Sequence, residues 1–242
     1  MSRVFLPQPL SAGSEIALPE EAFRHLVQVL RMREGESFIA FNGEGGEYQA
    51  RLARLAKRSA SATIEAFHAV DRESPRPLHL AQCVSKGDRM DYTLQKAVEL
   101  GVTAIQPLLS SRSVVRMDGE RWEKKLDHWR GVIVSACEQS GRTRIPQLHP
   151  VQALTAWLDA GGGAGERLTL DPLAAHGLRE MPEPQGAVTL LVGPEGGLSD
   201  AELDAARRAG YVGVRLGPRV LRTETAGVAA LAAIQALWGD WG

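Results

Sequence analysis

The sequence of 242 residues contains only two cysteines, Cys83 and Cys137. Their spacing fits neither a disulfide framework nor a zinc site, which favours a reduced intracellular setting. No apolar run approaches the roughly 20 residues of a transmembrane helix, and the N-terminus lacks the hydrophobic region of a signal peptide. The histidines are scattered and form no H-E-x-x-H pattern, so we expect no catalytic metal. We therefore expect a cytoplasmic protein that binds no membrane.

Two common nucleotide-binding motifs are also missing. The sequence has no G-x-x-x-x-G-K-[ST] segment, which disfavours a nucleotide hydrolase that cradles phosphates. It has no G-x-G-x-x-G segment after the first strand expected beyond residue 72, which disfavours a conventional dinucleotide site.

Charge is nearly balanced over the whole chain but unevenly distributed. The net charge of −1 argues against indiscriminate binding of nucleic acid. Residues 76–150 carry a net charge of +4, whereas residues 151–242 carry −4. A surface that faces phosphates is therefore expected in the basic middle of the chain, although solvated charge on helices produces similar swings.

The first 72 residues predict a small β-domain. Residues 19–21 (P-E-E) are a favourable helix start, because proline is tolerated in the first turn and acidic residues suit the helix dipole. Strands are expected at residues 37–41, 48–55 and 61–67, which suggests a small barrel. The polar, proline-bearing residues 71–77 read as a linker.

From residue 73 onward, expected strands and helices alternate. We expect strands at residues 78–84, 104–109, 168–170, 188–192 and 212–216, and helices at residues 91–100, 120–140, 151–159, 200–209 and 223–237. This alternation predicts an α/β domain with a mostly parallel sheet that helices cover on both faces. The predicted domains are therefore residues 1–72 and residues 73–242.

Two glycine-rich loops follow strands of the predicted sheet. Residues 193–197 (G-P-E-G-G) follow the strand expected at residues 188–192. Ser199 and Glu202 then form a capping-box pattern that opens a helix. Residues 217–226 (G-P-R-V-L-R-T-E-T-A) follow the strand expected at residues 212–216. Glycines at the carboxyl end of a strand let main-chain groups approach a ligand closely. One glycine pair alone would indicate only a tight turn, but two such loops favour a shared pocket.

Seven segments carry a resemblance to a known family. They are residues 3–5 (RVF), 25–31 (HLVQVLR), 86–90 (KGDRM), 95–101 (QKAVELG), 138–142 (EQSGR), 193–197 (GPEGG) and 216–226 (LGPRVLRTETA). The chain resembles the SPOUT-class methyltransferases, and specifically the enzymes that methylate N3 of a uridine in 16S ribosomal RNA. The resemblance covers essentially the whole chain, and its last two segments are highly specific together. The family's usual Ser-Glu-Arg-Ser reads Ser-Ser-Arg-Ser at residues 110–113, a departure that removes no group needed for chemistry.

The resemblance implies an N-terminal PUA-like barrel that binds RNA and a C-terminal SPOUT α/β domain whose chain forms a trefoil knot. It implies a homodimer with the active site at the interface, and S-adenosylmethionine as methyl donor with S-adenosylhomocysteine as product. It also implies 16S ribosomal RNA or the small ribosomal subunit as substrate, with the target uridine in the decoding region. Positions that match the family's cofactor site are Leu170, Gly193, Glu195, Gly196, Gly197, Leu216, Gly217, Leu221, Thr223, Thr225 and Ala226.

Uracil N3 carries a proton at neutral pH, so methylation requires a base or stabilisation of the anion that forms. Glu138 is our candidate base, with Arg142 and Arg222 holding phosphate or uracil oxygens. Glu138 and Arg142 are four residues apart and would share a helical face, so an ordinary surface ion pair is the alternative. Glu224 is a rival base, although the start of a helix would make it less basic. Arg222 could instead pack the cofactor loop, and Cys137 is expected to be a buried structural thiol rather than a nucleophile.

Six basic residues are candidates for RNA contacts: Arg3, His25, Arg31, Lys86, Arg89 and Lys96. Lys86, Arg89 and Lys96 could instead be solvated charges on helices. His25 could instead be a buried interior residue. If RNA is the substrate, the target uridine has to leave its stack to reach a recessed pocket.

Two other functions stay open at this point. The first is an α/β enzyme that uses the glycine loops for a nucleotide or small metabolite, against which the missing lysine-bearing phosphate loop counts. The second is a non-enzymatic RNA-binding protein whose α/β domain only dimerises. The polar residues 222–225 at the end of a strand count against this second function, because a scaffold has no need of them there.

Overall fold

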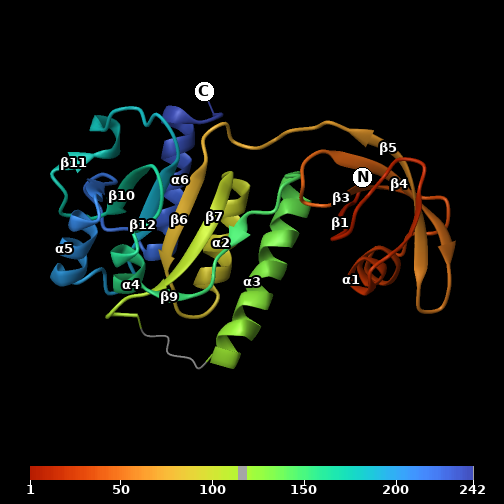
Figure 1. The fold of residues 1–242 in the computed structure, drawn as a ribbon, viewed down its shortest axis with the longest axis horizontal. Coiled ribbons are helices and arrows are strands. Elements are labelled where there is room, and N and C mark those ends of the chain that lie inside the picture. The colour runs from red at the N-terminus through yellow and green to blue at the C-terminus, as the bar shows by residue number, and fades with distance from the viewer. Residues whose placement is uncertain (114–118, 242) are drawn as a thin grey trace. The chain divides into compact units, whose positions relative to one another are not determined.

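The computed structural model describes residues 1–113 and 119–241, and the chain divides into two compact units (Figure 1). The first unit comprises Met1–Glu73 and Cys137–Ile145, and the second comprises Ser74–Ala136 and Pro146–Gly242. The boundary expected at residue 72 falls beside the first division point. The segment Cys137–Ile145 is grouped with the N-terminal residues although it lies far from them in sequence.

The first unit contains one five-stranded sheet in the order β1-β3-β4-β5-β2. Its strands are β1 (Arg3–Phe5), β2 (Glu15–Ala17), β3 (Ser37–Phe41), β4 (Glu47–Leu55) and β5 (Ala60–His68). Strand β1 runs parallel to β3, and the other neighbours are antiparallel. The three longer strands confirm the sequence prediction. Strands β1 and β2 were not predicted, because three residues are too few for an alternating pattern.

A short helical segment closes the core of the first unit. Helix α1 (Glu20–Phe23) starts after Pro19 as predicted and continues as the π-helix η1 (Arg24–Val29). Leu26 of η1 and Phe38 of β3 are fully buried in one apolar cluster. Burial of such side chains contributes roughly 1.5–3 kcal/mol each. This packing, rather than helix propensity, fixes the segment on the sheet.

The second unit is built on an eight-stranded sheet in the order β11-β13-β10-β12-β6-β7-β8, with β9 also paired to β7. Its strands are β6 (Leu78–Cys83), β7 (Val102–Leu109), β8 (Gln147–Leu148), β9 (Gln152–Ala153), β10 (Glu166–Leu170), β11 (His176–Gly177), β12 (Val188–Val192) and β13 (Val212–Arg215). All of these pairings are parallel. Strand β12 lies inside the sheet and is buried at every position. The prediction of a mostly parallel α/β sheet is confirmed.

Helices cover both faces of this sheet, as Figure 1 shows. They are α2 (Arg89–Glu99), α4 (Leu154–Asp159), α5 (Asp200–Arg208) and α6 (Thr223–Trp238). Helices α4 and α5 pack in one cluster with Ala81 and Leu191. Gly227 of α6 instead faces Leu80 and Val192, the neighbours of those residues along the two strands. Because successive strand residues point to opposite faces, α6 lies on the face opposite α4 and α5.

Several boundaries differ from the sequence prediction. Helix α3 (Gly119–Ser140) agrees with it, and its last residues, from Cys137, belong to the first unit. The predicted helix at residues 151–159 is wrong at its start, because Gln152–Ala153 pair with β7 and α4 begins only at Leu154. The two-residue strands β8 and β11 and the 3-10 helix η2 (Leu178–Glu180) were not predicted. Pairing with a neighbouring strand decides such short elements, and local sequence does not encode it.

Within the described ranges, 1–113 and 119–241, no helix combines the length and the apolar composition needed to cross a membrane.

Candidate functional site

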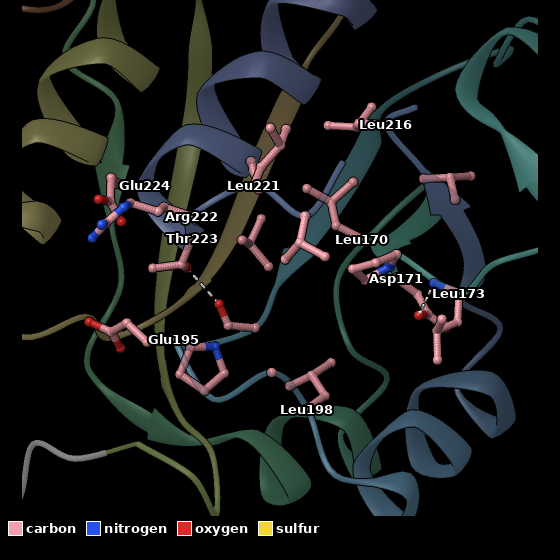
Figure 2. Close-up of a pocket in the computed structure, with 18 of the residues that line it drawn as sticks. Leu170, Asp171, Leu173, Glu195, Leu198, Leu216, Leu221, Arg222, Thr223 and Glu224 are labelled. Carbon is pink, nitrogen blue, oxygen red and sulfur yellow. Dashed lines mark hydrogen bonds between the residues drawn. The ribbon is translucent and has the colours of Figure 1, made fainter. Parts of the chain in front are cut away.

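Three loops at the carboxyl edge of the parallel sheet line one pocket in the second unit (Figure 2). They follow β10, β12 and β13, which are neighbours in the sheet order β13-β10-β12. The loop after β10 contributes Asp171 and Leu173, and the other two are the glycine-rich loops identified in the sequence. The cavity has a volume of about 730 Å³. This is the edge at which ligands bind in parallel α/β sheets, and the volume suits a cofactor.

Thr223 connects the two glycine-rich loops. Its hydroxyl donates to the main-chain oxygen of Gly193 at 2.6 Å, the bond drawn beside Thr223 in Figure 2. The Thr223 hydroxyl oxygen in turn accepts a hydrogen bond from the buried Gln82 side-chain amide at 3.1 Å. Thr223 begins helix α6, so this hydrogen-bond pair holds the start of α6 against the end of β12.

Glycine is required for close packing in the loop after β12. A Cβ atom on Gly193 would lie 3.1 Å from Leu198 Cγ and 3.2 Å from the Leu198 main-chain nitrogen. Gly197 has a φ of +68°, a left-handed conformation that other residues adopt only at a cost. The two glycines therefore let this loop turn tightly and pack closely against Leu198 at the edge of the pocket.

The end of this loop is held by a helix cap. Ser199 accepts a hydrogen bond from the main-chain N–H of Glu202, and the Glu202 carboxylate accepts one from the Ser199 N–H at 2.8 Å. The predicted capping box is confirmed. Glu202 also accepts from the N–H of Ser111 at 2.7 Å, and Arg112 donates to the main-chain oxygen of Gly196 at 2.9 Å. Burial alone would raise the pKa of Glu202, but these Ser199 and Ser111 donors hold it below its ordinary value.

The pocket has an apolar wall and a charged rim. Leucines 170, 198, 216 and 221 surround the hollow in Figure 2, whereas Glu195, Arg222 and Glu224 lie together on another side. Arg222 is exposed, and no ion pair of its guanidinium occurs among the described residues. The arrangement can hold a flat, partly apolar ligand through main-chain N–H and C=O groups and leave charged side chains for a second ligand.

The structure brings most of the predicted cofactor residues together. All of them line the pocket except Gly196 and Thr225. Asp171, Leu173 and Val220 line it as well but were missed. The sequence could have indicated Asp171 and Leu173, because they directly follow a predicted strand and the carboxyl ends of parallel strands meet at one edge.

Two of the three candidate catalytic residues, Glu138 and Arg142, lie in the first unit. The Glu138 carboxylate accepts a hydrogen bond from the Phe5 main-chain N–H at 3.0 Å, and burial raises the pKa of Glu138. Arg142 is only 3% exposed and donates to the Glu73 carboxylate at 2.9 Å. The expectation that Glu138 and Arg142 share a helical face is wrong, because α3 ends at Ser140 and Gly141 has a φ of +83°.

The six candidate RNA-binding residues differ in exposure and in ion pairing. Arg3 pairs with Glu47 in the first unit, and Lys96 pairs with Glu99 at 2.7 Å on α2. Arg31 and Lys86 are exposed, and Arg31, two residues beyond the end of η1, has an unusual φ of +55°. His25 is half-buried in η1. Arg89 lines the pocket.

The two cysteines are buried and unpaired, as expected for structural thiols. Burial raises the pKa of Cys137 to about 12, and it does the same for Cys83. A thiol that holds its proton so firmly is a poor nucleophile at neutral pH. Among the described residues, no group of three or more His, Cys, Asp or Glu side chains is placed to hold a metal ion.

Comparison with known proteins identifies the family. The model of the RNA methyltransferase domain matches residues 72–235, and the model of the RNA methyltransferase PUA domain matches residues 18–65. The chain belongs to the RNA methyltransferase family. The resemblance inferred from the motifs is thereby confirmed, and so is the PUA-like nature of the N-terminal domain. The family model of the larger domain includes all three pocket loops.

Individual members of this family match almost end to end. Ribosomal RNA small subunit methyltransferase E from Neisseria gonorrhoeae, in a crystal structure bound to S-adenosyl methionine, is 44% identical, with 100% of both chains covered and a TM-score of 0.94. A protein from Legionella pneumophila, solved in complex with the bound cofactor SAM, is 40% identical over 98% of both chains, also with a TM-score of 0.94. Ribosomal RNA small subunit methyltransferase E from Bacillus subtilis is 32% identical, covering 97% of this chain and 96% of the relative.

Proposed function

We propose that this protein transfers the methyl group of S-adenosylmethionine to N3 of a uridine in 16S ribosomal RNA. The observation that carries the proposal is the pocket formed by the loops after β10, β12 and β13, where nearly all positions matched to the family's cofactor site meet. The family membership and the relative from Neisseria gonorrhoeae bound to S-adenosyl methionine support the same donor.

The pocket fits this donor on structural grounds. Gly193 lets the loop after β12 pack closely against Leu198, and a Cβ atom there would displace this wall of the pocket. The adjoining wall is made of leucines 170, 216 and 221, which suit an apolar ring face. Main-chain groups of the glycine loops can bind an adenine edge and ribose hydroxyls without charged side chains. When bound, the donor supplies a methyl group whose bond to sulfur breaks as the bond to N3 forms, and the electron pair stays on sulfur in S-adenosylhomocysteine.

The chain's own contribution includes removing the proton from uracil N3. We assign this step to Glu138, whose carboxylate would accept the proton. Burial raises the pKa of Glu138, with partial opposition from the Phe5 N–H, His25 and Arg3. A raised pKa makes a carboxylate a stronger base, which suits proton abstraction near neutral pH.

The cations of the site have different roles in this proposal. Arg222 is exposed on the pocket rim and is suited to hold an RNA phosphate or a uracil oxygen. Arg142 is buried against Glu73, so we propose that it orients the segment that carries Glu138 and binds RNA only if that contact opens. Arg31 and Lys86, both exposed, are the candidates best suited to contact RNA phosphates directly.

We further propose a cytoplasmic homodimer whose residues 1–72 bind RNA and whose residues 73–242 form the knotted methyltransferase domain. The composition of α6 supports the dimer. Its residues from 226 to 238 are almost all apolar, and the helix has no strong polar face. Leu237 of α6 remains 41% exposed in the single chain. A helix that is apolar all round is normally buried, so a partner is expected to cover its open side.

Calorimetry combined with a map of modified nucleotides tests the function. We expect S-adenosylmethionine and S-adenosylhomocysteine to bind once per protomer without added metal. We also expect mass spectrometry of 16S ribosomal RNA incubated with protein and donor to show one methylated uridine. Binding of ATP in place of both ligands would favour a metabolite enzyme. RNA binding with neither donor binding nor methylation would favour a non-enzymatic scaffold.

A further inference from the structure

Arg89, the first residue of α2, contacts carboxylates from both glycine-rich loops. Its Nη1 lies 2.9 Å from Glu195 Oε1, in the loop after β12. Its Nε lies 3.8 Å from Glu224 Oε1, in the first turn of α6. All three side chains line the pocket. One guanidinium therefore bridges two elements that come from distant parts of the sequence.

The bridge is reinforced on the Glu195 side. Burial alone would raise the pKa of Glu195, but main-chain N–H groups, including that of Lys86, and the Arg89 guanidinium hold it below its ordinary value. The Lys86 N–H donates to the same Glu195 oxygen at 3.2 Å. Glu195 is thus held in its ionised form by the turn that leads into α2.

The Glu224 side depends more heavily on Arg89. Its Oε2 atom is buried and has no hydrogen-bond partner within the described residues. Its side chain is 16% exposed, so water compensates its charge only in part. Without the guanidinium, the carboxylates of Glu195 and Glu224 would repel each other across a partly solvated rim.

We infer that Arg89 is a positioning residue that holds the loop after β12 to the start of α6 and thereby fixes the width of the methyl-donor pocket. The inference rests on the proposed function, because it takes the ligand to be S-adenosylmethionine. It differs from the sequence expectation that Arg89 contacts RNA phosphate. The Thr223–Gly193 hydrogen bond joins the same two elements, so the bridge adds a second, charged tie.

Calorimetry with S-adenosylhomocysteine on Arg89 variants of the full chain tests the inference. Arg89→Ala is expected to raise the Kd about tenfold or more. Arg89→Lys is expected to recover part of the loss, since lysine keeps the charge but not the planar fork. Arg207→Ala is the matched control, because it removes an exposed ion pair with Asp204 outside the pocket, and it should leave the Kd unchanged. Melting curves of the variants report whether each one folds.

A double-mutant cycle separates positioning from a general loss of structure. In a Glu195→Gln, Glu224→Gln background the carboxylates no longer repel, so Arg89→Ala should raise the Kd less than threefold there. Equal effects in both backgrounds would overturn the inference. So would an unchanged donor Kd in Arg89→Ala together with weaker, less salt-dependent RNA binding, which would identify a phosphate contact. Failure of the unmodified protein to bind either donor or product would instead overturn the proposed function.

Discussion

The carboxyl groups of Glu138 and Glu195 are both partly buried, yet their surroundings shift their pKa values in opposite directions. Burial raises the pKa of Glu138, whose carboxylate accepts a hydrogen bond from the Phe5 main-chain N–H. Glu195 experiences burial as well, but the Lys86 N–H and the Arg89 guanidinium outweigh it and lower its pKa. The first unit therefore holds a carboxylate with a tendency to take up a proton, and the second holds one fixed in its ionised form.

This difference separates two tasks of the proposed enzyme. A base must change its protonation state during the reaction, whereas a loop anchor must not. The pocket of the second unit is held by groups that keep their protonation state: the ionised Glu195, the glycines of the two loops and Thr223. Variants of the two units should accordingly affect turnover and ligand affinity in different ways.

The largest expected effect is on turnover in Glu138→Gln. Glutamine keeps the shape but cannot accept the N3 proton, so kcat should fall by about 100-fold or more. The Kd for S-adenosylmethionine should stay unchanged. Single-turnover methylation and calorimetry measure the two quantities. Glu65→Gln, at an exposed carboxylate paired with Arg51 in the same unit, is the control. Unchanged turnover in Glu138→Gln would remove Glu138 from the base role.

Thr223→Val should destabilise the second unit. Valine fills the same volume but removes, at a buried position, the hydrogen bonds that the Thr223 hydroxyl makes with the Gly193 oxygen and the Gln82 amide. The free energy of unfolding should fall by about 2 kcal/mol, measured by urea denaturation. Thr225→Val, two residues along on the exposed side of α6, should change it by less than about 0.5 kcal/mol. Equal effects of the two variants would show that the hydrogen bonds of Thr223 with Gly193 and Gln82 do not stabilise the second unit.

Gly193→Ala should weaken donor binding while leaving the chemical step intact once donor is saturating. The added methyl group meets both the side chain and the main chain of Leu198, so the loop has to shift. A rise in Kd of about tenfold, or about 1.4 kcal/mol, is expected from calorimetry. Gly186→Ala meets no atom within 4 Å and should bind donor normally. Normal affinity in Gly193→Ala would show that this wall does not touch the ligand.

The smallest effect concerns pH and the helix cap of α5. Because donors from Ser199 and Ser111 lower the pKa of Glu202 in the folded protein, its stabilisation is present above the ordinary value of 4.5. It is lost as pH falls below that value and through the lower folded pKa. Melting temperatures between pH 6 and pH 3 should therefore fall less steeply in Glu202→Gln than in the unmodified protein. If the melting temperatures of the two proteins fell equally with pH, ionisation of Glu202 would not contribute to stability.

The sequence predicted those parts of the site that local patterns encode. The buried run of β12 and the Ser199–Glu202 cap lie within a few residues, so spacing alone indicated both. The two glycine loops were placed in one pocket because parallel strands end at the same edge. The family positions within them came from the motifs and not from spacing.

Long-range pairing explains what the sequence did not reveal. The ion pair of Arg89 with Glu195 joins residues 106 positions apart, and that of Arg142 with Glu73 joins residues 69 apart. Nothing within a helix or strand records such partners. The same holds for the segment Cys137–Ile145, where Arg144 forms an isolated bridge with Gly43. From the sequence alone, a basic residue that contacts RNA therefore could not be distinguished from one that forms an ion pair within the fold.

A crystal structure of the protein with S-adenosylhomocysteine would show whether the pocket between the glycine-rich loops is the methyl-donor site. We expect density for the ligand between the loops that follow β12 and β13, with main-chain atoms of residues 193–197 and 216–221 at hydrogen-bonding distance. The side chains of Arg89, Glu195 and Glu224 should keep their bridge beside it. Density at any other place on the chain, or ligand contacts made chiefly by charged side chains, would show that the glycine-rich loops do not form the donor site.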